Sequence, residues 1–208
     1  MPKHVDKAID FLTERIALIA AEKAKYADSI TAGNWPEILL RPDVEYGISN
    51  PEIAPVGYRT LMVWKLAEQH YQKPGLYQKL LEKLPKKNIR PNAVALIPLL
   101  KMEELDYIFD YSSLAIQQGL RVIDLPPQIH LGDPKLADLY KTVSVEIPGE
   151  KPGTTKKIEG SPIVYSIARL KDAPNPIAAQ AFADFILGPQ GRAIMAEMGM
   201  TPLAVASR

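Results

Sequence analysis

The chain has 208 residues, of which 47% are hydrophobic and 24% are charged, and its formal net charge is +1. This length is typical of one globular domain, or of two small lobes that share a hinge. The near-neutral balance argues against nucleic acid as a partner, because phosphate binding requires a basic excess. The absence of cysteine excludes disulfides, cysteine nucleophiles and thiolate metal sites.

The N-terminal region combines an expected helix with an expected buried strand. Apolar residues at Val5, Ile9 and Leu12 predict a helix over residues 4–13. The continuous apolar run at residues 16–20 predicts a strand that is buried on both faces. The first residues contain acidic side chains and no unbroken apolar stretch, so they do not predict a signal peptide.

The middle of the chain predicts short elements in alternation. Asn34 is the expected cap of a short helix, and residues 44–48 read as a second buried strand. The strongest helix is predicted at residues 55–69, where Pro55 fits the first turn. Two more helices are predicted at residues 76–84 and 92–100, followed by a strand at 105–111.

The remaining third continues this alternation. Ser112 or Ser113 is the expected cap of a short helix that ends at Gly119. Strands are expected at 121–125 and 163–168, a loop at 148–160, and helices at 177–187 and 189–198. Helices that alternate with apolar strands predict an α/β fold with a mixed sheet.

Seven short segments together carry a family resemblance. They are YGISNP at 46–51, PVGYR at 55–59, ELDYIFDYSS at 104–113, LGDP at 131–134, SPIVY at 161–165, AFADFIL at 181–187 and GPQG at 188–191. Their order and spacing resemble the tungstate/molybdate-binding proteins of archaeal ABC transporters. The resemblance runs from about residue 13 to the end of the chain.

The resemblance implies a fold like that of type II periplasmic binding proteins, with one complete lobe and a partial first lobe joined by crossover strands. Residues 1–21 are expected to form the remnant of lobe I and the first hinge strand, with its crossing at 16–20. Residues 22–158 would form lobe II. Residues 159–208 would form the second hinge strand, with its crossing at 162–168, and the C-terminal helices of lobe I. The opening part of lobe I, whose serine-containing loop contacts the oxyanion, is not matched by this chain.

The function implied by the resemblance is that of the substrate-binding component of an ABC importer for tungstate or molybdate. Such a protein binds the oxyanion without catalysis and without a cofactor. Its partners are the transporter's permease and ATPase, and its location is extracytoplasmic.

The start of the helix at Pro55 is the first candidate for oxyanion binding. Helix N-termini present N–H groups without intrahelical acceptors, together with a dipole that favours anions. The expected donors are the N–H groups of Val56 and Gly57, with Ala54 beside them, and Gly57 lets the backbone approach closely. From the sequence alone, a plain helix start packed under a loop explains these residues equally well.

Two side chains at the end of the 105–111 strand complete the candidate site. The resemblance implies that the Tyr111 hydroxyl contacts the ligand, and that Asp110 matches a carboxylate that coordinates tungsten or molybdenum directly. The second carboxylate of such relatives would fall at Ala54, which cannot ligate, and Glu52 is only a weak substitute. Tetrahedral oxyanion binding is therefore favoured over an expanded coordination shell. In general, a tyrosine or an acid at a strand end is more often structural.

Other polar residues and other functions were weighed against this interpretation. For Arg59, a surface or interlobe salt bridge is expected rather than a position facing the anion. The three histidines lack ligand spacing. No serine has the context of a nucleophile elbow, so an enzyme is not predicted. An oxyanion-sensing domain of a transcription regulator and a truncated remnant that binds nothing remain as alternatives.

Overall fold

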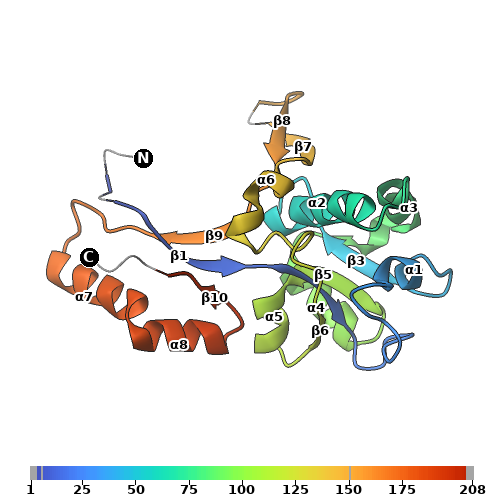
Figure 1. Cartoon of the computed structure of the whole chain (residues 1–208), viewed down its shortest axis with the longest axis horizontal. Helices are drawn as coiled ribbons and strands as arrows, with labels where there is room; N and C mark the ends of the chain where they lie inside the picture. The colour runs from blue at the N-terminus through green and yellow to red at the C-terminus, as the bar shows by residue number, and fades with distance from the viewer. Residues whose placement is uncertain (1–3, 6, 150, 205–208) are drawn as a thin grey trace.

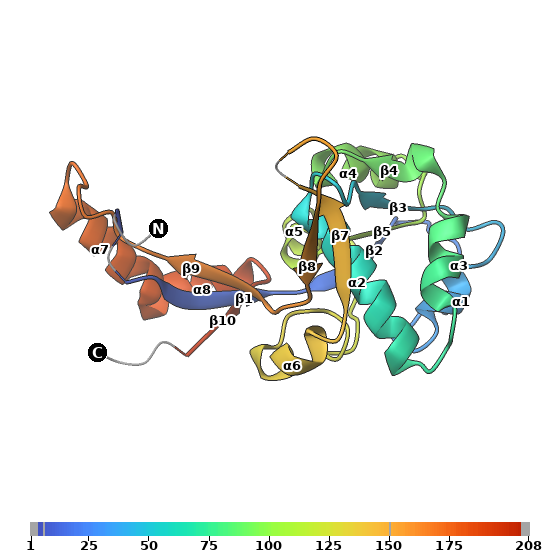
Figure 2. The same cartoon turned by 90° about the horizontal axis from the view of Figure 1, so that it is seen from above.

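The computed structural model describes residues 4–5, 7–149 and 151–204. The chain forms a larger body around a five-stranded sheet and a smaller body around a three-stranded sheet. The views in Figures 1 and 2 show the two bodies joined by strands that run from one to the other. The backbone passes between the sheets at Arg15 and again at residues 160–162.

The larger sheet is mixed. Its strands are, in spatial order, β4 (Ile89–Arg90), β3 (Tyr46–Ser49), β5 (Tyr107–Tyr111), β2 (Ile16–Ala20) and β6 (Arg121–Ile123). β3 is parallel to β4 and β5, whereas β2 is antiparallel to β5 and β6. All five residues of β2 are buried, which confirms the strand that the apolar run predicts.

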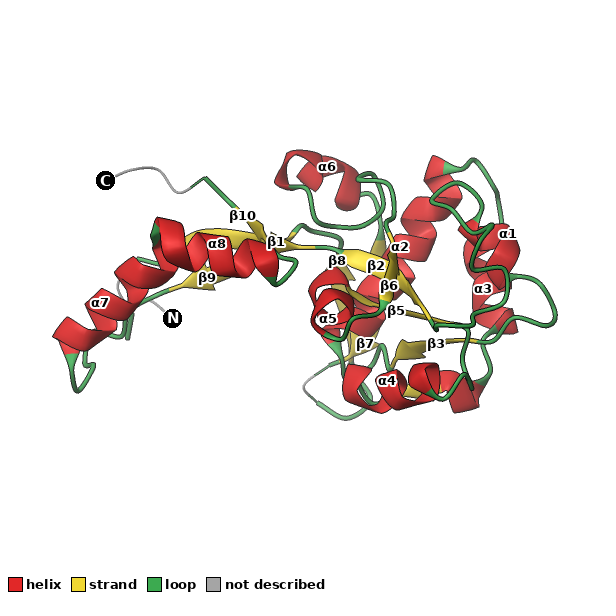
Figure 3. Ribbon diagram, turned by 90° about the horizontal axis from the view of Figure 1, so that it is seen from below, coloured by secondary structure: helices red, strands yellow, loops and turns green. Residues whose placement is uncertain are grey.

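Helices cover both faces of this sheet. They are α1 (Trp35–Leu39), α2 (Pro55–His70), α3 (Leu76–Lys83), the 3-10 turn η1 (Lys86–Asn88), α4 (Ala93–Lys101) and α5 (Ser112–Gln117). The chain moves from β3 to β4 on one side of it, and then returns across β3 to form β5 on its other side. The two connections therefore cross the sheet in opposite directions. Because crossovers between parallel strands are right-handed, α2 and α4 must lie on opposite faces. Figures 1 and 3 show α2 and α3 on one side and α4 and α5 on the other.

The core of the larger body is built on Phe109 in the central strand β5. The rings of Trp35 and Trp64 meet the Phe109 ring edge to face, with centroids 5.4 Å and 5.6 Å away. All three side chains are fully buried. Such aromatic contacts add to the free energy of burial and fix the position of α2 over the sheet.

A hairpin projects from the larger body. It consists of β7 (Ser144–Pro148) and β8 (Thr155–Glu159), and it follows η2 (Pro134–Leu136) and α6 (Ala137–Tyr140). The Lys65 ammonium of α2 donates to the Ser144 carbonyl at 2.7 Å and ties the hairpin to the body. The loop expected over 148–160 is therefore wrong in part, because pairing with β7 makes residues 155–159 a strand.

The smaller body has the strand order β10 (Thr201–Pro202), β1 (Ile9–Glu14) and β9 (Ile163–Ile167). α7 (Pro176–Leu187) and α8 (Pro189–Glu197) lie along one side of it. The helix expected over 4–13 is wrong, because residues 9–14 form β1 and pair antiparallel with β9. Residues 1–3 and 6 of the N-terminal segment lie outside the described residues.

The other expectations are confirmed in outline and corrected in two caps. The structure has the strands expected at 44–48, 105–111, 121–125 and 163–168, and the helices expected at 55–69, 76–84, 92–100, 177–187 and 189–198, each within a few residues. Asn34 precedes α1, but its side chain makes no cap hydrogen bond. Tyr111 is the N-cap of α5, so Ser112 and Ser113 lie inside its first turn.

The assignment of residues to two lobes stays a prediction, and β2 pairs within the larger sheet. No helix in the described part of the chain is long and apolar enough to span a membrane.

The aromatic core leads to a stability prediction. We expect Phe109→Ala to lower the free energy of unfolding by about 3–5 kcal/mol, because it removes a fully buried ring and leaves a cavity beneath α2. Urea unfolding followed by tryptophan fluorescence measures this change. The control is Met102→Ala at a 67% exposed side chain, which should change the stability by less than about 0.5 kcal/mol. Equal stabilities of the two variants would contradict this account of the core.

Candidate functional site

A hollow with a volume of about 410 Å³ lies where β3 and β5 end. Its lining residues are Ala54, Pro55, Val56, Asn92, Ala93, Asp110, Tyr111, Ser113, Leu114 and Gln117. These residues come from the end of β5, from the starts of α2 and α4, and from α5. The three helices follow the parallel strands β3, β4 and β5. In open α/β sheets, a crevice of this kind forms where neighbouring parallel strands send their helices to opposite faces.

The starts of α2 and α4 line this hollow. Ala54 is the N-cap of α2, and its methyl side chain makes no cap hydrogen bond. The N–H of Val56, in the first turn, has no intrahelical acceptor. Asn92 caps α4, and its side-chain oxygen accepts from the Ala95 N–H at 3.2 Å. This bond leaves the amide group of Asn92 free to donate elsewhere.

Gly57 positions α2 and does not line the hollow. Its N–H donates to the Ala54 carbonyl at 3.0 Å, so this donor is used within the turn. A Cβ at this position would lie 2.4 Å from the Ser49 carbonyl oxygen at the end of β3. The absence of a side chain therefore lets the start of α2 rest directly on the strand end.

Asp110 is the buried ionisable group of the hollow. Asp110 is 1% exposed, and its Oδ1 accepts a hydrogen bond from the Tyr111 N–H at 2.7 Å. Its Oδ2 is buried and has no hydrogen-bond partner among the described residues. Burial raises the pKa of this carboxyl to about 7, the Tyr111 N–H opposes the rise, and the nearby Glu14 carboxylate adds to it. At neutral pH, Asp110 can therefore hold a proton and act as a hydrogen-bond donor.

Tyr111 and Arg59 form a polar pair beside the hollow. The Arg59 guanidinium donates to the Tyr111 hydroxyl, and its carbon lies 5.9 Å from the centroid of the Tyr111 ring. The hydroxyl still carries a proton of its own, because burial raises the pKa of Tyr111 although the Arg59 charge opposes this rise. The expected salt bridge of Arg59 is wrong, since within the described residues its guanidinium meets a tyrosine and no carboxylate.

Glu14 and Tyr165 bring the crossover strands close to this group. The Oε1 of Glu14 accepts from the Ser112 hydroxyl at 2.9 Å. Its Oε2 is buried, and no residue in the described part of the chain forms a hydrogen bond with it. Tyr165 on β9 interacts electrostatically with Glu14, Arg59 and Asp110. The polar cluster therefore lies at the junction of the two bodies. Within the described residues, no three acidic, cysteine or histidine side chains gather closely enough to hold a metal ion.

A second hollow, of about 570 Å³, lies between the end of β1, the 127–135 segment and β10. It is lined in part by Arg15, His130 and Lys135. The Arg15 guanidinium is paired with Asp124 at 2.8 Å, and burial lowers the pKa of His130, which keeps its ring neutral. The smaller hollow at the strand ends is the better candidate for an anion, because two helix starts and an unpartnered buried group meet there.

The structure thus brings together four of the five residues that the sequence singles out. Ala54, Val56, Asp110 and Tyr111 line one hollow, and Gly57 stands one residue behind it. Sequence reasoning missed Asn92 and Ala93, although the Asn92 cap was a recognisable signal for a second helix start. It also missed the contact between Arg59 and Tyr111, which depends on how α2 packs against β5.

The raised pKa of Asp110 predicts a pH-dependent stability. A carboxyl whose pKa is higher in the folded state stabilises the fold below its unfolded pKa of 3.8, and this contribution is lost as the pH rises through about 7. We expect the free energy of unfolding of the unchanged protein to fall by roughly 2–3 kcal/mol between pH 5 and pH 8. In Asp110→Asn this fall should be absent, because the amide does not ionise. Urea unfolding at both pH values measures this difference.

The matched control for this experiment is Asp138→Asn. The Asp138 carboxylate is fully exposed, and its one ion pair within the described residues is with Lys141, which directly follows α6. It should unfold with the pH dependence of the unchanged protein. If Asp110→Asn also showed that pH dependence, the carboxyl would be ionised in the folded protein and the description of the hollow would be incorrect.

Comparisons with solved structures show the same fold. The periplasmic molybdate-binding protein of Azotobacter vinelandii superposes on 98% of this chain with a TM-score of 0.58 at 17% identity, and the match covers 70% of that protein. Peb3 from Campylobacter jejuni superposes on 96% of the chain with a TM-score of 0.56 at 9% identity, and the match covers 70% of it. These matches confirm the expected α/β fold of the type II periplasmic-binding-protein kind.

Sequence comparison gives closer relatives. An uncharacterised solute-binding protein of Petrotoga mobilis is 46% identical over 96% of this chain, and the molybdate/tungstate-binding protein WtpA of Pyrococcus abyssi is 39% identical over 95% of it. The chain spans 62% of the length of each of these two relatives. The family model of bacterial extracellular solute-binding proteins matches residues 2–201. The chain therefore belongs to the bacterial extracellular solute-binding protein family.

Proposed function

We propose that this chain is the substrate-binding component of an ABC importer and that it binds tungstate or molybdate without catalysis. The observation that carries the proposal is the hollow at the ends of β3 and β5, which is lined by the starts of α2 and α4 and by Tyr111. Relatives such as WtpA of Pyrococcus abyssi bear the name of a molybdate/tungstate-binding protein. The permease and ATPase of the importer and an extracytoplasmic location follow from the proposed role.

A tetrahedral dianion can be held here by neutral donors. Backbone N–H groups at a helix start act with the helix dipole, and they are fixed in place before the ligand arrives. The Val56 N–H and the Asn92 amide supply such donors on two sides of the hollow. The Arg59 guanidinium polarises the Tyr111 hydroxyl, which strengthens the bond that this hydroxyl donates to the ligand. Arg59 thereby adds positive charge near the anion.

The protonation state of Asp110 distinguishes two ways in which the site can hold the metal oxide. A neutral carboxylic acid donates a hydrogen bond to an oxyanion oxygen, whereas an ionised carboxylate would add to the four oxygens and ligate the metal directly. Ala54 offers no second carboxylate, and burial favours the neutral form of Asp110. We therefore propose that Asp110 acts as a hydrogen-bond donor to a tetrahedral ligand.

Titration calorimetry with sodium tungstate, sodium molybdate and sodium sulfate tests the proposed function. We expect saturable binding of tungstate and molybdate, and an affinity that is about 10-fold lower in Tyr111→Phe, because one bond to a charged ligand is lost. The control is Tyr77→Phe, which removes a hydroxyl on α3 that makes no hydrogen bond within the described residues. Binding of sulfate alone, or equal affinities of the two variants, would contradict the proposal.

The Asp110→Asn variant separates the two modes of holding the ligand. If Asp110 donates a hydrogen bond, the amide that the substitution introduces replaces this donor, so we expect the variant to bind tungstate at pH 8 at least as tightly as the unchanged protein. If the carboxylate ligates the metal directly, the same variant should lose most of its affinity. Calorimetry at pH 6 and pH 8 distinguishes these outcomes.

A further inference from the structure

The residues that line the hollow at the ends of β3 and β5 all belong to the larger body. They lie between positions 54 and 117, and the smaller body contributes none of them. The smaller body nevertheless reaches the polar group beside the hollow, through the antiparallel pair formed by β1 and β9. Side chains of this pair are therefore the place to look for a further contact with a bound ligand.

The register of β1 and β9 determines which side chains share a face. Leu12 and Glu14 lie on one face of β1, because alternate residues of a strand point the same way. Tyr165 on β9 is paired with Leu12, so its side chain lies on this face too. Glu14 uses the same face to meet the Ser112 hydroxyl at the start of α5. Tyr165 is thus on the face that meets the larger body, diagonally across the strand pair from Glu14.

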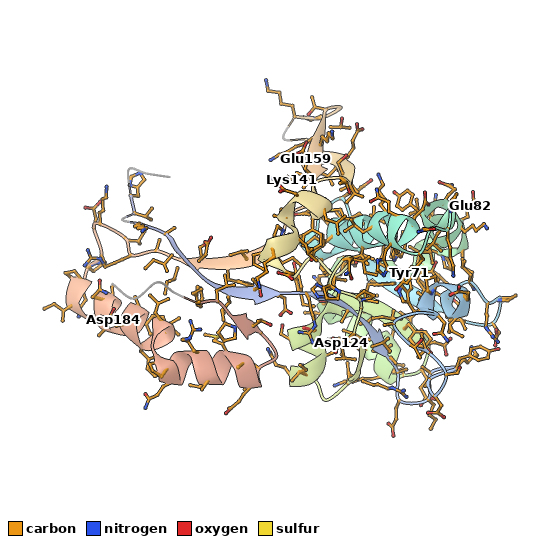
Figure 4. All side chains as sticks on the ribbon, in the orientation of Figure 1. Tyr71, Glu82, Asp124, Lys141, Glu159 and Asp184 are labelled. Carbon is orange, nitrogen blue, oxygen red and sulfur yellow. The ribbon has the colours of Figure 1, made fainter. Side chains whose placement is uncertain are left out.

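Figure 4 places this strand pair in the molecule. β1 and β9 run between the larger body, which carries the labelled Tyr71 and Glu82, and α7, which carries the labelled Asp184. The end of the pair nearer to the larger body holds Glu14, which is paired with Ile163. Tyr165, two residues further along β9, is therefore close enough for its long side chain to reach the junction of the two bodies.

The Tyr165 hydroxyl lies among the polar groups of the junction and is free to donate. It interacts electrostatically with Arg59 and Asp110, and with the Tyr111 side chain that lines the hollow. Within the described part of the chain it makes no hydrogen bond, and Tyr165 is 40% exposed. Burial raises the pKa of Tyr165, and the Glu14 carboxylate adds to this rise, so the hydroxyl keeps its proton at neutral pH. It is therefore a neutral hydrogen-bond donor.

We propose, on the basis of the function proposed above for the hollow, that the Tyr165 hydroxyl is a further contact of the bound oxyanion. The Tyr111 hydroxyl accepts from Arg59 and has one proton left to donate to the ligand. A second phenol beside it offers a donor of the same kind from the smaller body. The oxygens of a tetrahedral dianion can accept bonds from several directions, so the two tyrosines can bind one ligand together.

Calorimetric titration with sodium tungstate tests this contact through a double-variant cycle. We expect Tyr165→Phe to lower the affinity about 10-fold, because one hydrogen bond to a charged ligand is lost. If both phenols contact the ligand, the chain that combines Tyr111→Phe with Tyr165→Phe should bind roughly 100-fold more weakly than the unchanged chain. If Tyr165 only held Tyr111 in place, the combined variant would bind no more weakly than Tyr111→Phe alone.

The matched control is Ser166→Ala. Ser166 follows Tyr165 on β9 and points to the opposite face, where its hydroxyl donates to the Asp10 carboxylate. This variant should bind tungstate like the unchanged chain, and circular dichroism melts should show that all variants fold. Equal affinities of Tyr165→Phe and the unchanged chain, or a combined variant that binds as tightly as Tyr111→Phe, would overturn the role of Tyr165 and leave the proposed function intact. Absence of tungstate binding by the unchanged chain would overturn both.

Discussion

Two neighbouring parallel strands, β3 and β5, end side by side, and the helices that follow them leave toward opposite faces of the sheet. This arrangement opens a crevice that no element of the larger body fills, and it turns backbone donors toward the crevice. The right-handed sense of the crossovers makes this geometry a consequence of strand order. The close packing of Gly57 on Ser49 then fixes how near the start of α2 comes to the strand end.

The electrostatic character of the crevice follows from its burial. Asp110 lies at the last buried position of β5, where an ionised carboxylate would be poorly solvated and close to Glu14. Burial therefore favours the protonated form of Asp110, in which the carboxyl group donates a hydrogen bond that the carboxylate could only accept. Arg59 supplies positive charge through Tyr111. A hollow that contains one buried acid, with a second acid nearby, can thus still accommodate an anion.

Much of this arrangement could be predicted from local sequence. The apolar run at 16–20 and the proline at the start of α2 each identify an element, because burial on both faces and the first helical turn have local signatures. β1 could not be identified in this way, since its state is decided by pairing with β9 about 150 residues later. For the same reason, the contribution of Asn92 to the hollow became apparent only from the strand order. The contact of Arg59 with Tyr111 likewise depends on tertiary packing.

The most direct test of the account is the position of the metal in crystals soaked with sodium tungstate. Tungsten scatters anomalously at its absorption edge, so a difference map locates the ion without assumptions about its ligands. The account predicts a single strong peak in the hollow between the Val56 N–H and the Tyr111 hydroxyl, with four oxygens around it. A peak in the hollow beside Arg15 and His130, or no ordered peak at the ends of β3 and β5, would contradict it.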